Sequence, residues 1–324
     1  MFLSLSLAVV IPASLMFWLI SLFYQTINRD YAAPAPWRWL VAAIAPVLIA
    51  LYGLRKRSLD VSGAVAGLLV GFILTLSSLC FFSALLVFFL AGSKVTKLRA
   101  HQKKKFEEDY KEGGQRNWLQ VMCNGGVASV FAILYLLEVG CAEKTFDFSR
   151  RYSSTWWAAS VLGSLACCCG DTFASEVGTV FGHSKPWLVT NFQRVPRGTN
   201  GGVTFTGTVS SIFGGFIVGA AYYVALLLCT TELSLSDSPP QWPILLLATS
   251  AGFVGSIIDS YLGALLQFSG YDRRRACIVE HPGPHVEHIS GYAVLDNHGV
   301  NLLSSLLTGI ISPYIAWQLW LHVT

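Results

Sequence analysis

Long runs of apolar residues decide what this chain can fold into. A helix that crosses a bilayer needs about 20 mostly apolar residues, and such runs lie near residues 2–23, 38–54, 118–139, 155–175, 206–230, 243–268 and 301–322. In addition, 53% of the residues are hydrophobic and only 12% are charged, about half the charge density of a typical soluble domain. These features exclude a soluble enzyme, a secreted module and a disordered regulator, and they predict a chain embedded in a lipid bilayer.

The stretch 61–93 decides the number of crossings. As one helix rising 1.5 Å per residue it would be about 50 Å long, too long for a single crossing, so we divide it at Ser77 and Ser78. The sequence therefore predicts an all-α, polytopic membrane helix bundle of about nine transmembrane helices, within a range of seven to ten. Residues 1–37 form an N-terminal anchor helix and loop, and residues 38–324 form a polytopic, catalytic-like domain.

The distribution of charge gives the orientation of the bundle. Most of the 22 lysines and arginines fall in loops on one side of the predicted topology, and short loops rich in these residues stay in the cytosol. The net charge of +4 does not indicate nucleic-acid binding, because a membrane protein that keeps its basic loops on one side is mildly basic in any case.

The cysteines are expected to be packing residues, because six of the eight lie within apolar runs. One polar group has a spacing that suits zinc: Cys277, His281, His285 and His288. A polar loop near the lipid headgroups is the expectation that we prefer for this group.

Acidic and amide side chains gather toward the cytosolic ends of several predicted helices. Asp171 and Glu176 lie at the end of one helix, Asp259 lies in the cytosolic third of another, and Asn124 lies near the start of a third. Ionisable groups inside a membrane are costly and usually functional, and carboxylates are ligands that Mg²⁺ prefers. The sequence predicts that Asp171, Glu176 and Asp259 hold a metal ion. Helix packing, and helix capping by a residue such as Asp296, are the alternatives.

The loop after residue 182 carries complementary charge. Gly198, Gly201 and Gly202 allow backbone conformations that point several N–H groups at one anion, and a predicted helix begins shortly after them. The loop also contains basic and polar side chains suited to phosphates: Lys185, Arg194, Arg197, Thr199 and Asn200. A loop of this kind that faces two carboxylates suits the binding of a metal nucleotide.

Several strings of residues resemble a known family of integral membrane proteins. They are Gly170–Gly182, Lys185, Val195–Gly202, Ser93–Lys97, Arg116–Gly125 and Leu295–Asn301. The family contains animal transmembrane protein nineteen and the plant phytyl-phosphate kinase of vitamin E synthesis. The resemblance covers roughly residues 38–322, and the last string points to the animal branch.

A more remote similarity connects the first of these strings to dolichol and phytol kinases and to CDP-diacylglycerol synthases. The chain departs from the synthases after Gly202, where Val203 and Thr204 stand in place of a long acidic metal motif. The resemblance implies a kinase that uses CTP, or another nucleoside triphosphate, with Mg²⁺ and converts an isoprenoid lipid monophosphate into a prenyl diphosphate at the cytosolic face. Asp171, Lys185, Arg197 and Asp259 are then expected to be catalytic, and Arg194, Gly198, Thr199, Asn200, Gly201, Gly202 and Asn124 to bind the nucleotide.

Other functions stay open at this point. Glycine-interrupted helices near 170–182 and 252–263 also suit a transporter for an anionic or lipid substrate, although their polar groups lie near one face of the membrane. A prenyl alcohol kinase would need a general base, such as Asp259 or Asp296. A scaffold without chemistry leaves the pairing of acids with a glycine-rich loop unexplained. The expected location is the endoplasmic reticulum or another endomembrane.

Overall fold

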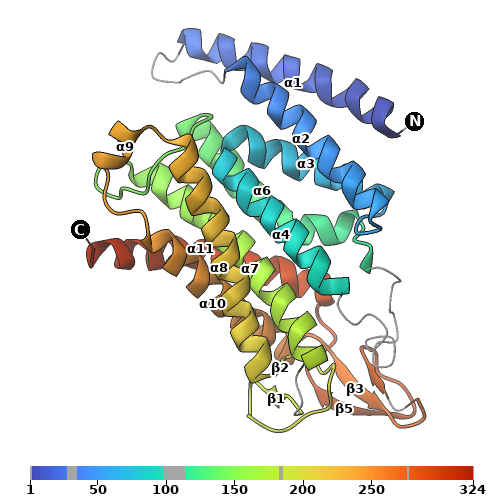
Figure 1. Ribbon diagram of the computed structural model, residues 1–324. Coiled ribbons are helices and arrows are strands. Elements are labelled where there is room, and N and C mark those ends of the chain that lie inside the picture. The colour runs from blue at the N-terminus through green and yellow to red at the C-terminus, as the bar shows by residue number, and fades with distance from the viewer. Residues whose placement is uncertain (1, 28–34, 98–113, 182–184, 276, 324) are drawn as a thin grey trace.

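The computed structural model describes residues 2–27, 35–97, 114–181, 185–275 and 277–323, and these ranges form a helical bundle (Figure 1). Its helices are α1 (Phe2–Ile27), α2 (Pro36–Arg55), α3 (Val61–Ser77), α4 (Leu79–Lys97), α6 (Trp118–Val139), α7 (Tyr152–Phe181), α8 (Phe205–Cys229), α9 (Glu232–Ser236), α10 (Pro243–Leu266) and α11 (Asn297–Leu321). Within the described residues, seven helices are long and apolar enough to cross a membrane. The predicted polytopic bundle is therefore confirmed, within the predicted range of crossings.

The predicted break between α3 and α4 is also present. Ser78 has an extended backbone, with φ −160° and ψ 139°, between the end of α3 and the start of α4. The N–H of Leu79 at this break donates to Glu143 Oε1 at 2.9 Å, and Glu143 forms an ion pair of 2.6 Å with Arg38. A buried ion pair thus satisfies a backbone group that the break leaves open.

Helix α7 lies at the centre of the bundle. Of its membrane span, 78% is buried inside the protein, compared with 33–50% for the other six candidate spans. It packs against α4, α6, α8, α10 and α11. At Gly170 the backbone of α7 is so near α10 that a Cβ atom would lie 2.5 Å from the carbonyl oxygen of Gly252. Small residues permit this close approach, which brings the residues after Gly170 next to α10.

Aromatic side chains fill the half of the bundle farther from the glycine-rich loop. Phe81 packs edge-on against Tyr135 with ring centroids 5.0 Å apart, and Phe146 stacks on Trp320 at 5.2 Å. Of the six cysteines in apolar runs, five are buried as packing residues, whereas Cys229 is exposed. This half has an apolar core beside the buried pair of Arg38 and Glu143, and the predicted site residues lie at the other end.

Two small antiparallel sheets cover that polar end (Figure 1). One pairs β1 (Trp187–Leu188) with β2 (Gly202–Val203), and the other has the order β4–β3–β5, from β3 (Ser269–Asp272), β4 (Cys277–Val279) and β5 (Val286–Ser290). The sequence analysis expected polar loops in both places, because such short polar strands lack a clear alternating pattern.

Candidate functional site

A polar cavity of about 1100 Å³ opens at the end of the bundle that the sheets cover. Its walls come from α4, α6, α7, α8, α10, α11, the residues 114–116, the glycine-rich loop and β4. The following predicted site residues line it: Asp171, Glu176, Arg197, Gly198, Thr199, Asn200, Gly201, Gly202 and Asp259. The structure thus brings the acidic residues of two helices and the glycine-rich loop to one cavity, while their roles stay predictions.

Asp171 and Asp259 form a carboxyl pair across the interface of α7 and α10. Their side chains are hydrogen-bonding neighbours, and Ser304 Oγ of α11 donates to Asp259 Oδ2 at 2.9 Å. With its amide oriented to donate, Asn301 places its NH2 group 3.3 Å from Asp259 Oδ2 and 3.2 Å from the carbonyl oxygen of Asn297. Polar contacts from α7 and α11 therefore fix the position of Asp259 on α10.

This carboxyl pair fits a divalent cation. Two neighbouring carboxylates repel each other unless a proton or a cation lies between them, and Mg²⁺ is usually bound through one or two carboxylates together with water and substrate phosphates. Glu176 lines the cavity as well, but the described residues contain no group of three His, Cys, Asp or Glu side chains that could hold a metal ion. The pair Asp171 and Asp259 is therefore the part of the predicted metal set that lies close together, and the role of Glu176 stays a prediction.

The zinc alternative is not supported either. No metal-holding group of three such side chains forms in the part of the chain that the structure describes. Instead, His288 Nε2 lies 2.8 Å from the carbonyl oxygen of Gly291, and His281 lines the polar cavity. Imidazoles in a polar loop region, as preferred from the sequence, agree with this arrangement.

Two glycines of the loop have backbone conformations that L-residues rarely adopt. Gly198 has φ +88° and Gly201 has φ +79°. At Gly201 a Cβ atom would also lie 2.4 Å from Cβ of Ala264. Glycine is therefore needed at Gly201 both for the turn and for the contact of the loop with α10.

The amides of this loop do not all face the cavity. The N–H of Asn200 donates to Ser269 Oγ at 3.0 Å, and the N–H of Gly202 donates to the carbonyl of Thr199 at 3.0 Å. Both hydrogen bonds hold the loop in place. The hydrogens of these two amides are thus already used within the protein, and binding of an anion by Asn200 and Gly202 stays a prediction.

Two helix N-termini provide positive potential at the cavity. The first turns of α8 and α11 line it, through Gly207 and Thr208 of α8 and Asn297 of α11, and helix N-termini favour anions. Asp296 accepts a hydrogen bond of 2.8 Å from the N–H of Gly299 and caps α11. Asp296 is a cap, as one alternative predicted, and is not among the residues that line the cavity.

Three predicted site residues lie elsewhere: Lys185, expected to be catalytic, and Arg194 and Asn124, expected to bind the nucleotide. The guanidinium of Arg194 lies 4.0 Å from the ring centroid of Trp187 and donates to the carbonyl of Lys185. Lys185 is exposed, and neither basic residue is among those that line the cavity. Asn124 lines a neighbouring apolar cavity. Their positions give no support to direct contact with a nucleotide.

Arg116 lines the cavity but was not among the residues predicted for the site. Arg116 is half-buried at the cavity wall, and its guanidinium donates to Ser93 Oγ at 3.2 Å. Burial lowers the pKa of this guanidinium, and no carboxylate of the described residues lies within ion-pair distance of it. The available signal was the string Arg116–Gly125, which carried the family resemblance but gave Arg116 no role of its own.

A bundle of this kind, with a polar cavity at one end, defines a multi-pass α-helical membrane protein. The chain belongs to the family of integral membrane proteins called DUF92, whose model matches residues 44–309. This confirms the membrane family, while the assignment to an animal branch stays a prediction.

Relatives of the chain occur in plants and archaea. The chain is 41% identical to Protein PGR of Arabidopsis thaliana, over 86% of its own length and 97% of that protein. It is 28% identical to the uncharacterized membrane protein MJ0933 of Methanocaldococcus jannaschii, over 86% of its own length and 94% of that protein. It is 29% identical to Protein VTE6, chloroplastic, of Arabidopsis thaliana, over 71% of its own length and 63% of that protein. No solved structure matches the chain.

Proposed function

We propose that this protein is a kinase of an isoprenoid lipid monophosphate, which uses CTP or another nucleoside triphosphate with Mg²⁺ and makes a prenyl diphosphate. The observation that carries the proposal is that the carboxyl pair Asp171 and Asp259 shares one cavity with Arg116, Arg197 and two helix N-termini. Acidic groups for a metal and positive groups for phosphates are the parts that phosphoryl transfer requires. The resemblance to the family of the plant phytyl-phosphate kinase and the match to Protein VTE6 support the lipid class.

The chemistry places most of the work on positioning and charge. When bound, the metal ion neutralises charge on the phosphates of the nucleotide. Asp171 and Asp259 hold that ion, and Arg116 and Arg197 stabilise charge on the transferred phosphoryl group. An oxygen of the acceptor phosphate attacks the γ-phosphorus, and the bond from that phosphorus to the β–γ bridging oxygen breaks, so the nucleoside diphosphate leaves.

A phosphate acceptor also explains why no general base is needed. The second pKa of a phosphate monoester is about 6, so its oxygens are already deprotonated at neutral pH. Asp259 accepts a hydrogen bond from Ser304, an arrangement that suits holding a metal ion rather than removing a proton. The aromatic core in the opposite half of the bundle counts against the transporter, because a transported solute would have to pass through it. The charge distribution supports a reaction at the cytosolic face of the membrane, and the chemistry of prenyl lipids supports the endoplasmic reticulum or another endomembrane.

The test is a transfer assay with the purified full-length protein in nanodiscs. CTP labelled at the γ-phosphate, Mg²⁺ and a panel of prenyl monophosphates and prenyl alcohols should give label in a prenyl diphosphate. Asp171→Asn should abolish transfer, while the control Asp237→Asn, at an exposed residue outside the cavity, should not change it. A wild-type protein that labels none of the acceptors with CTP or ATP refutes the proposal, and full activity of Asp171→Asn removes Asp171 from the site.

A further inference from the structure

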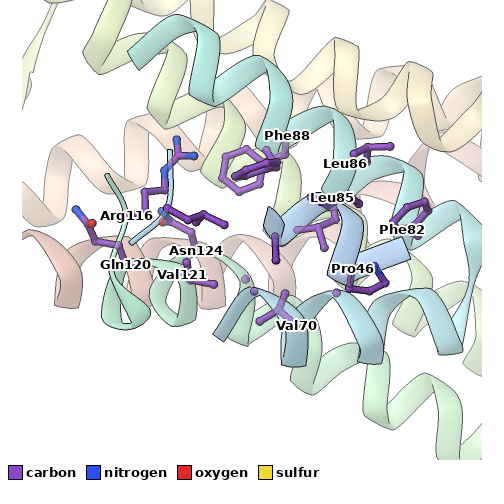
Figure 2. A pocket seen from close by; sticks show the side chains of 17 residues that line it. Pro46, Val70, Phe82, Leu85, Leu86, Phe88, Arg116, Gln120, Val121 and Asn124 are labelled. Atoms are coloured by element: carbon purple, nitrogen blue, oxygen red, sulfur yellow. The ribbon is translucent and has the colours of Figure 1, made fainter. Parts of the chain in front are cut away.

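A second, apolar cavity lies between α2, α3, α4 and α6, and we call it the slot. Figure 2 shows its lining, with Pro46, Phe82 and Leu86 at one end and Arg116, Gln120 and Asn124 at the other. The volume of the slot is about 80 Å³, far smaller than the 1100 Å³ of the polar cavity. Apart from the three polar residues at one end, its lining is apolar, so it is a narrow hydrocarbon space with one polar mouth.

The mouth of the slot opens toward the candidate active site. Arg116 and Gln120 line both the slot and the polar cavity. The backbone of Arg116 is fixed by two hydrogen bonds of 3.1 Å, from its N–H to the carbonyl of Ser58 and from the N–H of Asp60 to its carbonyl. Arg116 therefore has a fixed backbone position and lies at the boundary between the slot and the polar cavity that contains Asp171.

The positive charge of Arg116 has no negative partner among the described residues, so the site favours binding of an anion. Its guanidinium donates to the neutral hydroxyl of Ser93, and no carboxylate of the described residues pairs with it. A guanidinium pairs well with a phosphate, through two parallel hydrogen bonds. If a phosphate binds at Arg116, the group attached to that phosphate lies in the apolar slot.

Small residues keep the slot open. Gly67 of α3 lies in its wall, and a Cβ atom on Gly67 would meet only Cδ1 of Leu59, at 3.9 Å. Gly125 has a different role. A Cβ atom on Gly125 would lie 2.9 Å from Val70, so this glycine allows α3 and α6 to pack closely. The part of the slot next to Gly67 is therefore empty, and a larger side chain at this position would fill it.

We infer that the slot binds the first carbons of the hydrocarbon chain of a single-chain lipid phosphomonoester, whose phosphate lies at Arg116 and faces the polar cavity. A cavity of about 150 Å³ holds benzene, so the slot, at about 80 Å³, takes only the apolar carbons next to the phosphate. This excludes phosphatidic acid, whose phosphate is attached to a polar glycerol ester. The charge at the mouth selects a phosphate over a neutral alcohol, and the apolar wall selects an amphiphile over inorganic phosphate. The identity of this lipid as the phosphoryl acceptor rests on the proposed function, but its binding does not.

The binding is tested without nucleotide, by photolabelling of the purified full-length protein with a twenty-carbon prenyl monophosphate that carries a diazirine on the carbons next to its phosphate. We expect the label on α3 and α6, and we expect Gly67→Phe to lower labelling at least ten-fold. Leu69→Phe is the matched control, because Leu69 is on the same helix but 54% exposed on the outer face, and its labelling should not change. Gly67→Leu replaces the phenylalanine variant if that variant does not fold.

A second arm tests the phosphate. Arg116→Gln should lower labelling by the prenyl monophosphate several-fold and leave labelling by the matching diazirine alcohol unchanged, a difference that a purely structural role of Arg116 would not produce. Unlabelled prenyl monophosphate should compete, whereas phosphatidic acid and inorganic phosphate should not.

The outcomes separate this inference from the proposed function. Label outside α3 and α6, labelling that Gly67→Phe does not lower, or equal competition by phosphatidic acid overturns the slot as the lipid site. Labelling as expected without phosphoryl transfer supports the slot and refutes the kinase. Transfer with the label elsewhere refutes the slot and leaves the kinase in place.

Discussion

The close crossing of α7 and α10 at Gly170 should set the geometry of the carboxyl pair. In Gly170→Ala the new Cβ would lie 2.5 Å from the carbonyl oxygen of Gly252, and ordinary contact begins at 3.4 Å, so the helices must separate by about 1 Å. Overpacking of this kind costs about 1–3 kcal/mol, which exceeds the gain of about 1 kcal/mol that alanine brings over glycine in a helix. A shift of about 1 Å in Asp171 should also lower phosphoryl transfer about 100-fold.

The measurement is thermal unfolding in detergent together with the transfer assay. Gly67→Ala is the control, because its Cβ would meet only Leu59, at 3.9 Å, and its stability should be equal to that of the wild type or slightly higher. We expect a lower midpoint for Gly170→Ala by a few degrees and much weaker transfer. If Gly170→Ala is as stable as Gly67→Ala and as active as the wild type, the crossing does not determine the position of Asp171.

Three further predictions concern other parts of the molecule. Gly201→Ala places a side chain at φ +79° and within 2.4 Å of Ala264, so the free energy of unfolding should fall by about 1–3 kcal/mol. Isothermal titration should show weaker CTP binding, and unchanged binding would contradict the role of the loop. Arg38→Leu leaves the carboxylate of Glu143 buried without its partner, so the free energy of unfolding should fall by about 3–5 kcal/mol. The double variant Arg38→Leu with Glu143→Leu should regain part of that loss in the same unfolding measurement. If it does not, an unpaired buried carboxylate is not the cause of the loss. Burial, reinforced by Glu143 and opposed by Arg38, raises the pKa of Cys141 to about 12, so at pH 8 only about one molecule in 10,000 carries the reactive thiolate. Maleimide labelling of Cys141 should therefore be slow at pH 8 and accelerate as the pH rises. Rapid labelling at pH 8 would show that the thiol is not desolvated.

The helices were predictable because a bilayer fixes their length. The apolar stretch 61–93 is too long for one crossing, and this argument alone located the break that the structure has at Ser78. The sheet of β3, β4 and β5 was not predictable in the same way, because its strands are short and polar and their pairing depends on where α10 ends and α11 begins.

The candidate site was partly predictable for a similar reason. Asp171 and Asp259 stand out in the sequence because carboxylates inside membrane helices are rare, and the structure places them side by side. The direction of the Asn200 amide, which donates to Ser269 from a distant segment, has no local signal. Arg116 was hidden as well, because its isolation from carboxylates is a property of the tertiary structure.

The central position of α7 has a consequence for biosynthesis. It is the least apolar of the seven candidate spans and the most enclosed by other helices, and buried hydroxyl residues such as Ser160 and Ser164 lie along it. When α7 leaves the ribosome, α8, α10 and α11 have not yet been made, so these hydroxyl groups first meet lipid tails instead of protein. Stable insertion of α7 therefore depends on helices that are synthesised after it, and chains cut short before α8 should be poorly retained in the membrane and degraded early.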